Sequence, residues 1–89
     1  MKIIVELYGA SRDFSNEGSI QIELKKNSCI KDLRNELIKF IEKKHKGNKN
    51  FYQIAISSAF CLENNNIVND DYSISKEQKI AIIPPIAGG

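Results

Sequence analysis

The last six residues, 84–89, are the ones whose types and order could do chemistry. Pro84 and Pro85 fix the backbone φ angle at about −65° and offer no N–H group to a neighbouring strand, so they direct the end of the chain away from the folded body. Gly88 and Gly89 have no Cβ and can enter a narrow slot. We therefore expect the carboxylate of Gly89 to be a reactive group on a stalk. A partner enzyme could activate it with ATP as an acyl-adenylate and exchange it for sulfur or an amine.

A Gly-Gly end is a weak signal by itself, because a frayed terminus of no significance has the same appearance. The full order is more specific, since two prolines follow a last apolar strand directly and Ile86 and Ala87 separate them from the glycines. We expect this segment to thread into a partner's active site. Its members are Pro84, Pro85, Ile86, Ala87, Gly88 and Gly89.

Conventional catalytic residues are scarce in the rest of the chain. Cys29 and Cys61 lack the spacing of a metal site, and His45 is the only histidine, so the sequence favours neither a metal centre nor a Cys/His nucleophile. We expect both cysteines to be small, buried and structural. Asp70 and Asp71 are adjacent, which points their side chains apart and favours a solvated turn. The chain is therefore expected to bind no cofactor and no metal, and to depend on partners for catalysis.

Length and charge restrict the class of protein. A chain of 89 residues fits one domain, and a net charge of +2 is too small to favour nucleic acid as a partner. Lysines around 43–49 indicate a solvated helix end more than a phosphate-binding patch. Charged or polar residues interrupt every apolar run before about 18 residues, so we expect no membrane span and no signal peptide. We therefore expect a cytoplasmic protein, or one of an organelle whose targeting segment is absent from this sequence.

The first half of the chain predicts a hairpin followed by a helix. Apolar residues alternate over 2–7 and 19–25, which is typical of two half-buried strands joined by a polar turn over 9–18. Over 29–46 an apolar stripe recurs at helical spacing. Asn27-Ser28 offers a helix N-cap and Gly47 a C-cap. The stripe consists of Ile30, Leu33, Leu37, Ile38 and Ile41.

The second half predicts three further strands. The segment 51–62 is rich in β-branched and aromatic residues and is expected to hold at least one strand after a loop at 47–50. Asn64-Asn65-Asn66 predicts a turn, and Ile67-Val68 a short return strand. The apolar run at 79–83 predicts a central last strand covered on both faces.

This order, β-β-α-β-β-β, predicts an α+β fold in which one main helix at about 29–46 packs on a mixed sheet, a ubiquitin-like β-grasp roll. The body would span 1–83, and 84–89 would form an extended tail. The helix stripe is expected to meet Ile3, Val5, Ile20, Ile22, Ile80 and Ile82.

The sequence resembles the ubiquitin-like sulfur carriers, and among them the small subunits of molybdopterin synthase. The segments that carry the resemblance span essentially the whole chain, and the ending is the most specific of them. They are 7–13 (LYGASRD), 30–33 (IKDL), Asn64 ahead of 67–68, and 80–89 (IAIIPPIAGG). The chain departs from the family at 77–79, where Glu-Gln-Lys replaces a Gly-Asp-Glu turn, and over 46–58, which fits loosely.

The resemblance implies a sequence of partners. An adenylating enzyme related to ubiquitin-activating enzymes would use ATP to activate Gly89, and a sulfur donor, a cysteine desulfurase or a rhodanese-like protein, would convert it to a thiocarboxylate. The large subunit of molybdopterin synthase would accept the tail, in a hetero-oligomer, and pass the sulfur to cyclic pyranopterin. The resemblance also assigns Tyr8, Ile67 and Ile83 to the partner interface, with Ile86 on the tail.

Three other interpretations stay open at the level of sequence. A sulfur carrier for thiamine thiazole synthesis or tRNA thiolation would have the same Gly-Gly end, although the Pro-Pro stem favours molybdopterin. A ubiquitin-like protein modifier would join Gly89 to lysines of other proteins. A ubiquitin-like binding module with an inert tail would use neither reaction.

Overall fold

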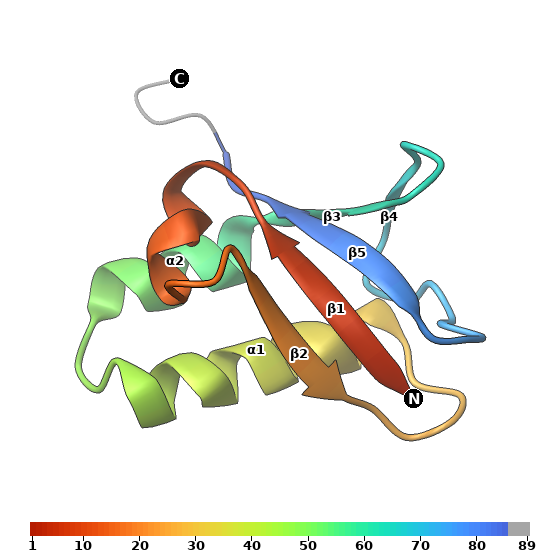
Figure 1. Cartoon of the computed structure of the whole chain (residues 1–89), viewed down its shortest axis with the longest axis horizontal. Coiled ribbons are helices and arrows are strands. Elements are labelled where there is room, and N and C mark those ends of the chain that lie inside the picture. The colour runs from red at the N-terminus through yellow and green to blue at the C-terminus, as the bar shows by residue number, and fades with distance from the viewer. Residues whose placement is uncertain (86–89) are drawn as a thin grey trace.

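The structure, a computed structural model, describes residues 1–85. Two α-helices and a short 3₁₀ helix cover one face of a five-stranded sheet in this part of the chain (Figure 1). The elements in chain order are β1 (Lys2–Leu7), the 3₁₀ helix (Gly9–Phe14), β2 (Ser19–Glu23), α1 (Ile30–Lys44), α2 (Lys49–Ser57), β3 (Ala59–Leu62), β4 (Ile67–Val68) and β5 (Gln78–Ile83). This confirms the predicted α+β, β-grasp architecture with α1 as its main helix.

The strand order is β2-β1-β5-β3-β4. β1 and β2 pair antiparallel with Ile3 opposite Ile22, which confirms the predicted hairpin. β5 lies parallel to β1 and antiparallel to β3, so the last strand is central, as predicted. The sheet is therefore mixed, and β5 runs through its middle toward the end of the chain.

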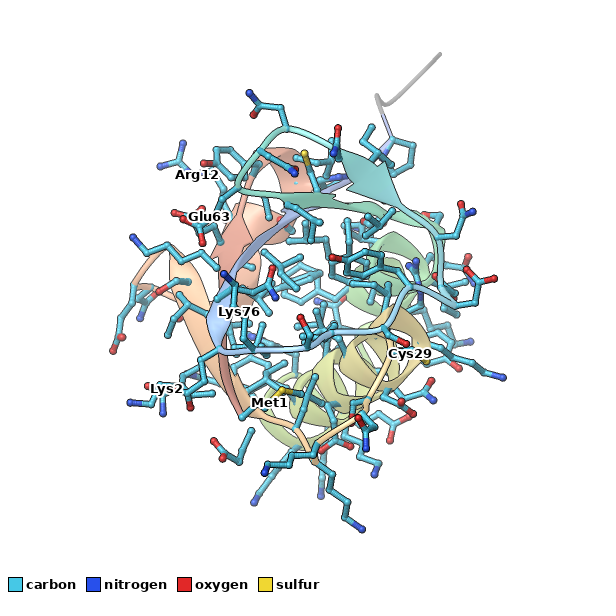
Figure 2. All side chains as sticks on the ribbon, turned by 90° about the vertical axis from the view of Figure 1, so that its right-hand side faces the viewer. Met1, Lys2, Arg12, Cys29, Glu63 and Lys76 are labelled. Atoms are coloured by element: carbon cyan, nitrogen blue, oxygen red, sulfur yellow. The ribbon has the colours of Figure 1, made fainter. Side chains whose placement is uncertain are left out.

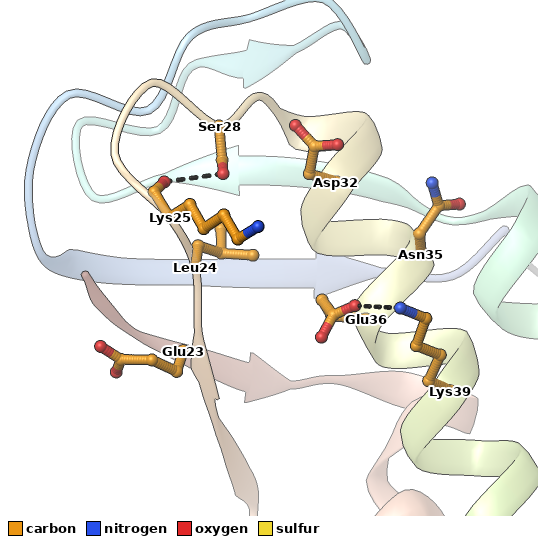
Figure 3. Close-up of a pocket in the computed structure, with 8 residues that line it drawn as sticks. All are labelled: Glu23, Leu24, Lys25, Ser28, Asp32, Asn35, Glu36 and Lys39. Atoms are coloured by element: carbon orange, nitrogen blue, oxygen red, sulfur yellow. Dashed lines mark hydrogen bonds and ion pairs between the residues drawn. The ribbon is translucent and has the colours of Figure 1, made fainter.

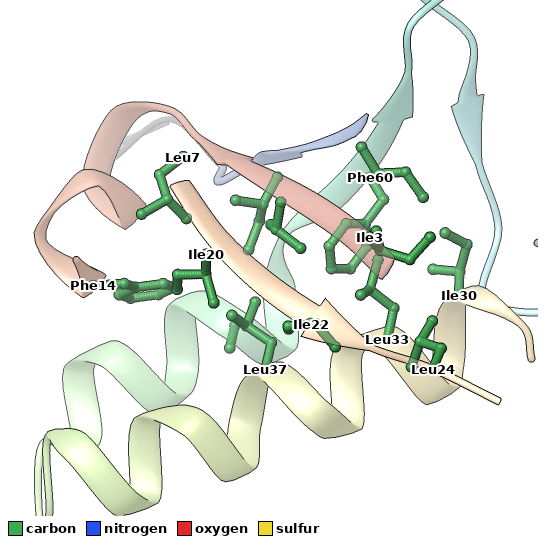
Figure 4. Close-up of a cluster of buried hydrophobic side chains, with 14 of the residues drawn as sticks. Ile3, Leu7, Phe14, Ile20, Ile22, Leu24, Ile30, Leu33, Leu37 and Phe60 are labelled. Carbon is green, nitrogen blue, oxygen red and sulfur yellow. The ribbon is translucent and has the colours of Figure 1, made fainter. Parts of the chain in front are cut away.

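The core lies between the sheet and the helices (Figure 4). Every second residue of each long strand points into it, because side chains alternate between the two faces of a sheet. The apolar stripe of α1 closes it from the other side, with Leu33 and Leu37 fully buried. The predicted strand partners of this stripe are all buried: Ile3, Val5, Ile20, Ile22, Ile80 and Ile82.

The start of α1 differs from the prediction. The N-cap residue is Cys29, and the Asp32 carboxylate accepts its backbone N–H at 2.9 Å and its thiol at 3.4 Å. Asn27 instead occupies a turn with φ of 65°, and the Ser28 hydroxyl donates to the carbonyl of Lys25. The C-cap is His45 rather than Gly47. The cap lies after Asn27-Ser28 because the Asp32 carboxylate, three residues after Cys29, accepts the backbone N–H of Cys29, whereas the Ser28 hydroxyl is bonded to Lys25.

The sequence predicted a loop over 47–50 and at least one strand within 51–62. The helix that occupies the first part of this stretch was not predicted. Residues 49–57 form α2, and only Ala59–Leu62 is a strand. The Asn48 side chain caps the helix by accepting the N–H of Phe51 at 3.0 Å. Phe51 and Ala55, four residues apart, both face the core. Tertiary burial and a cap therefore override the strand propensity of this segment.

The loop predicted over 9–18 holds the 3₁₀ helix and contributes to the core. The Ser11 hydroxyl is buried and bonds to the backbone of Tyr8, accepting its N–H at 3.0 Å and donating to its carbonyl at 2.6 Å. Phe14 is fully buried, 5.2 Å from the ring of Phe51. His45 approaches the same cluster, with Nε2 2.9 Å from the carbonyl oxygen of Phe14.

Two predictions about burial were wrong. β5 is covered on one face only, because Ile80 and Ile82 are buried whereas Lys79 is exposed and Ile83 is 38% exposed. The cysteines are free, and neither Cys29 nor Cys61 is buried.

No helix in residues 1–85 is long and apolar enough to cross a membrane.

Candidate functional site

The base of the C-terminal tail lies at the end of β5. Pro84 is half-buried and Pro85 is exposed. A Cβ added to Gly9 would lie 3.8 Å from Cδ of Pro84, so the proline ring rests beside the first residue of the 3₁₀ helix. Gly9 has φ of +55°, a conformation that residues with a Cβ rarely adopt. The predicted threading residues Ile86, Ala87, Gly88 and Gly89 lie outside the described residues.

The sheet face turned away from the helices, here called the outer sheet face, carries residues from four strands in one row. Glu6 pairs with Ala81, Ala81 with Cys61, and Cys61 with Ile67. Directly opposed residues on neighbouring strands point to the same face. The row therefore runs from β1 across the centre of the sheet to its β4 edge.

The three predicted interface residues are among the most exposed large apolar side chains of the described chain. Tyr8 is 49% exposed, Ile67 is 68% exposed and Ile83 is 38% exposed. Ile67 stands at the β4 end of the row. Tyr8 and Ile83 line the same shallow cleft of about 410 Å³ on the outer sheet face. All three are thus surface residues and not part of the core, and Tyr8 and Ile83 lie next to the base of the tail.

Charged side chains surround this cleft. Glu6, Glu63 and Lys79 line it, and the Lys79 backbone N–H donates to the Glu63 carboxylate at 3.3 Å. A second cleft shares Glu6 and Tyr8 and is bounded by Arg12, which Figure 2 shows at the same edge of the molecule as Glu63. An apolar patch with a charged rim is the usual anatomy of a protein-docking surface. This charged rim could not be predicted from the sequence, because the register of the strands decides which charged side chains lie together.

Cys61 also lies in this cleft, among Tyr8, Ala81 and Ile83. Its thiol is 3.6 Å from the carbonyl oxygen of Leu62. The alternation of β3 could have revealed this position, because Phe60 must face the core and its neighbours must then face outward.

The predicted turns formed in two different ways. Asn65 has φ of 68°, and Asn64 accepts the Asn66 N–H at 3.1 Å, which confirms the asparagine turn. The stretch 75–79 turns without any residue at positive φ, and Gln78 already belongs to β5. Glu77 accepts the Lys2 N–H at 2.8 Å and so ties this turn to β1. A glycine is therefore not required there.

Asp70 lies in an exposed turn, as the sequence predicted, but it also has an ion-pair partner that the sequence did not indicate. Its carboxylate forms a two-point ion pair with Arg34, with Nη2 at 2.7 Å and Nε at 3.3 Å. Asp71 is exposed, as predicted. The signal that could have revealed the pair is the position of Arg34, one turn after Ile30 on the flank of the apolar stripe.

A polar cleft of about 390 Å³ lies between the end of β2 and α1 (Figure 3). Three of its charged side chains are engaged within the protein, since Glu36 pairs with Lys39 at 2.9 Å and the Asp32 carboxylate accepts the N–H of the N-cap residue of α1. The backbone N–H and then the thiol of Cys29 lower the pKa of the Asp32 carboxyl. Residues 1–85 contain no group of three His, Cys, Asp or Glu side chains arranged to hold a metal ion. The outer sheet face is therefore the best candidate for a functional surface.

The sequence matches the ThiS family over residues 5–89, whereas no curated protein matches it. Solved structures with the same fold include a Pyrococcus furiosus protein provisionally described as molybdopterin converting factor, subunit 1. It is 18% identical with a TM-score of 0.71, and the alignment covers 97% of this chain and 99% of that one.

Two further similar structures are ubiquitin-like proteins of archaea. Small archaeal modifier protein 1 from Haloferax volcanii is 11% identical, with a TM-score of 0.67 and coverage of 96% and 98%. Caldiarchaeum subterraneum ubiquitin is 14% identical, with a TM-score of 0.58 and coverage of 100% and 98%. At these identities the structures establish the fold alone, and the family match establishes the kinship. The chain belongs to the ThiS family and has the ubiquitin-like sulfur carrier fold.

Proposed function

We propose that this protein is the sulfur carrier subunit of molybdopterin synthase. The carboxylate of Gly89 attacks the α-phosphate of ATP on an activating enzyme, which releases pyrophosphate and leaves an acyl-adenylate. A persulfide on the sulfur donor then attacks the acyl carbon and displaces AMP, which gives an acyl disulfide. A thiol reductant cleaves its S–S bond, which releases the donor's thiol, oxidises the reductant to a disulfide and leaves a thiocarboxylate. The large synthase subunit takes up the tail and transfers the sulfur to cyclic pyranopterin.

The observation that carries this proposal is the exposed apolar surface at the base of the tail. Tyr8 and Ile83 line the outer-face cleft, and Pro84 follows Ile83 directly. A carrier must present both a reactive end and a surface that several partners recognise. Large exposed apolar side chains next to that end serve as such a surface.

The choice of molybdopterin over other sulfur acceptors is supported by two features. The sequence continues from β5 into Pro84-Pro85-Ile86-Ala87-Gly88-Gly89, the ending that resembles the synthase small subunits. The Pyrococcus furiosus neighbour, provisionally a molybdopterin converting factor subunit, has the same fold over nearly its full length. Reconstitution with thiazole-forming and tRNA-thiolating acceptors would separate the alternatives, and sulfur transfer to either of these but not to the molybdopterin enzyme would overturn the assignment.

The proposal assigns ATP to the activating partner, and the carrier works in the cytoplasm as part of a hetero-oligomer. The sulfur donor is a cysteine desulfurase or a rhodanese-like protein. Tyr8, Ile67 and Ile83 contact the large subunit, and Ile86 accompanies the tail into its active site. Each step of catalysis takes place on a partner.

The direct test is deletion of Gly89 in a reconstituted synthase. The truncated chain is expected to fold with the melting temperature of the wild-type chain and to transfer no sulfur to the pyranopterin. A suitable control is Lys46→Ala, which changes an exposed residue far from the outer sheet face. Sulfur transfer by the truncated chain would contradict the proposal.

A protein modifier is the second candidate, favoured by the fold shared with an archaeal modifier protein and an archaeal ubiquitin. Its signature would be isopeptide bonds between Gly89 and lysines of other proteins. Mass spectrometry of tryptic peptides from cells that express the tagged chain would detect these branches. Their presence in the wild type and loss on deletion of Gly89 would support the modifier, whereas their absence alongside sulfur loading would favour the carrier.

A further inference from the structure

The side chain of Arg34 on α1 joins two segments that are distant in sequence. Its Nη1 donates to the carbonyl oxygens of Ala55, Ile56 and Ser58 at 2.8, 3.1 and 2.7 Å. Its Nε and Nη2 donate to the carboxylate of Asp70. A planar guanidinium can satisfy both sets at once because its donors point in fixed directions.

The guanidinium is held from several sides. Only 14% of the Arg34 side chain is exposed, and its Cζ lies 4.9 Å from the centre of the Phe60 ring. Asp70 is itself fixed to α1, because its carbonyl oxygen accepts the N–H of Lys31 at 2.9 Å. The Asp70 carboxylate therefore orients Arg34 from a position that α1 already determines.

The three carbonyls mark the point at which α2 ends and β3 begins. The last turn of a helix leaves carbonyls without partners in the helix, and Arg34 supplies donors for them. The next residue along the chain, Ala59, is the first of β3 and pairs with Ile83. Arg34 thus holds the backbone directly before the strand that borders the end of β5.

The end of β5 has few other supports. On its other side the register with β1 stops one residue earlier, where Leu7 pairs with Ile82. Within the sheet register, Ile83 therefore has Ala59 as its partner and no partner from β1. Pro84 follows Ile83, so the pairing with Ala59 supports the base of the tail together with the contact between Pro84 and Gly9.

We propose that Arg34, oriented by Asp70, is a positioning residue for the tail: it holds the start of β3 against Ile83 and so fixes the point from which Pro84 leaves the sheet. Its effect on sulfur loading rests on the function proposed above. Its effect on the sheet end does not.

The first test is amide hydrogen exchange on the full chain by NMR. Asp70→Asn replaces one of the two carboxylate oxygens that accept from Arg34 with an amide nitrogen. Arg34→Lys keeps the positive charge but removes the planar guanidinium. Exchange at residues 58–60 and 82–83 is expected to accelerate by about tenfold or more relative to the β1–β2 hairpin, as local opening free energies fall. Ile22→Val, a loss of one buried methylene in β2, is the control for general destabilisation. Acceleration at 58–60 and 82–83 no greater than in this control would overturn the proposal.

The second test is the kinetics of acyl-adenylate formation with the activating enzyme. Asp70→Asn is expected to raise KM by roughly tenfold at unchanged kcat, because the reactive end is intact but presented from a looser base. Ile22→Val should keep the wild-type KM. A wild-type KM in Asp70→Asn would overturn the positioning role, even with faster exchange. If the wild-type chain is not adenylated at all, the proposed function fails, and amide exchange alone then decides on Arg34.

Discussion

At the scale of single residues, the proposed function separates the reactive end of the chain from the side chains that would bind a partner. Tyr8, Ile67 and Ile83 expose apolar surface on the outer sheet face, and Glu6, Glu63 and Lys79 line the cleft beside them. We propose that these side chains contribute recognition of a partner, which can be measured apart from sulfur transfer.

Ile67→Asp is expected to weaken binding of the large subunit by about tenfold or more, since a buried apolar anchor of an interface is worth more than about 1 kcal/mol. Ile67 is 68% exposed, so the melting temperature should change little. Ile56→Asp is the matched control, because Ile56 is 42% exposed on α2, on the helical side of the molecule. Titration calorimetry would measure both affinities, and equal losses in the two variants would argue against the outer sheet face as the interface.

Alkylation of Cys61 should have the same effect as a bulky substitution in the cleft. Iodoacetamide applied to a Cys29→Ser variant would label Cys61 alone, and the adduct is expected to prevent large-subunit binding by steric exclusion. The same treatment of a Cys61→Ser variant would label Cys29 at the start of α1 and should leave binding unchanged. Binding that survives complete Cys61 labelling, verified by intact mass, would contradict this placement.

At the scale of secondary-structure elements, the parts predicted correctly are those with strong periodicity. The alternation of β1 and β2 and the stripe of α1 each specify a buried face without help from distant residues. The parts that were missed depend on tertiary contacts. α2 relies on its Asn48 cap and on the Arg34 bonds to its last carbonyls. The burial of Phe14 in the 3₁₀ helix relies on Phe51 and His45, which no local pattern brings together.

The cap of α1 gives a pH prediction. The N–H of Cys29 lowers the pKa of Asp32 in the folded state below its ordinary value of 3.8. The stabilisation is therefore fully present above that value and is lost as pH falls through the lowered folded pKa. Asp32→Asn should lower the melting temperature near pH 7. The difference from the wild type should shrink below about pH 4. Thermal melts of both proteins across pH 2–7 measure this difference in melting temperature. A difference that stays constant over that range would contradict this role of the Asp32 carboxylate.

At the scale of the whole molecule, the fold is a sheet with helices on one face and an open face on the other (Figure 1). The sequence predicted the layers and the central β5, and the assignment of Tyr8, Ile67 and Ile83 to an interface stays a prediction. The sequence did not predict that one face of the sheet is open. The continuous apolar run at 80–83 has the pattern of a strand covered on both faces, although only Ile80 and Ile82 are buried. Burial of alternate residues is a property of the sheet and becomes visible only with its neighbours in place.

The open face and the base of the tail form one continuous functional region under this account. β5 runs through the centre of the sheet and ends beside Tyr8, Ala59 and the Gly9–Pro84 contact. A partner bound to the outer sheet face would therefore lie next to the point at which Pro84 begins the tail. Under the proposed function, the folded body would position the tail and the partners would carry out the reaction.

Intact-mass measurement tests the central claim most directly. The full chain is incubated with ATP, an activating enzyme, a persulfide donor and a thiol reductant, and its intact mass is then measured. We expect a mass gain that corresponds to the replacement of one oxygen by one sulfur at Gly89, which requires ATP and disappears when Gly89 is deleted. An unchanged mass with an activating enzyme that loads a known carrier in the same mixture would contradict the account.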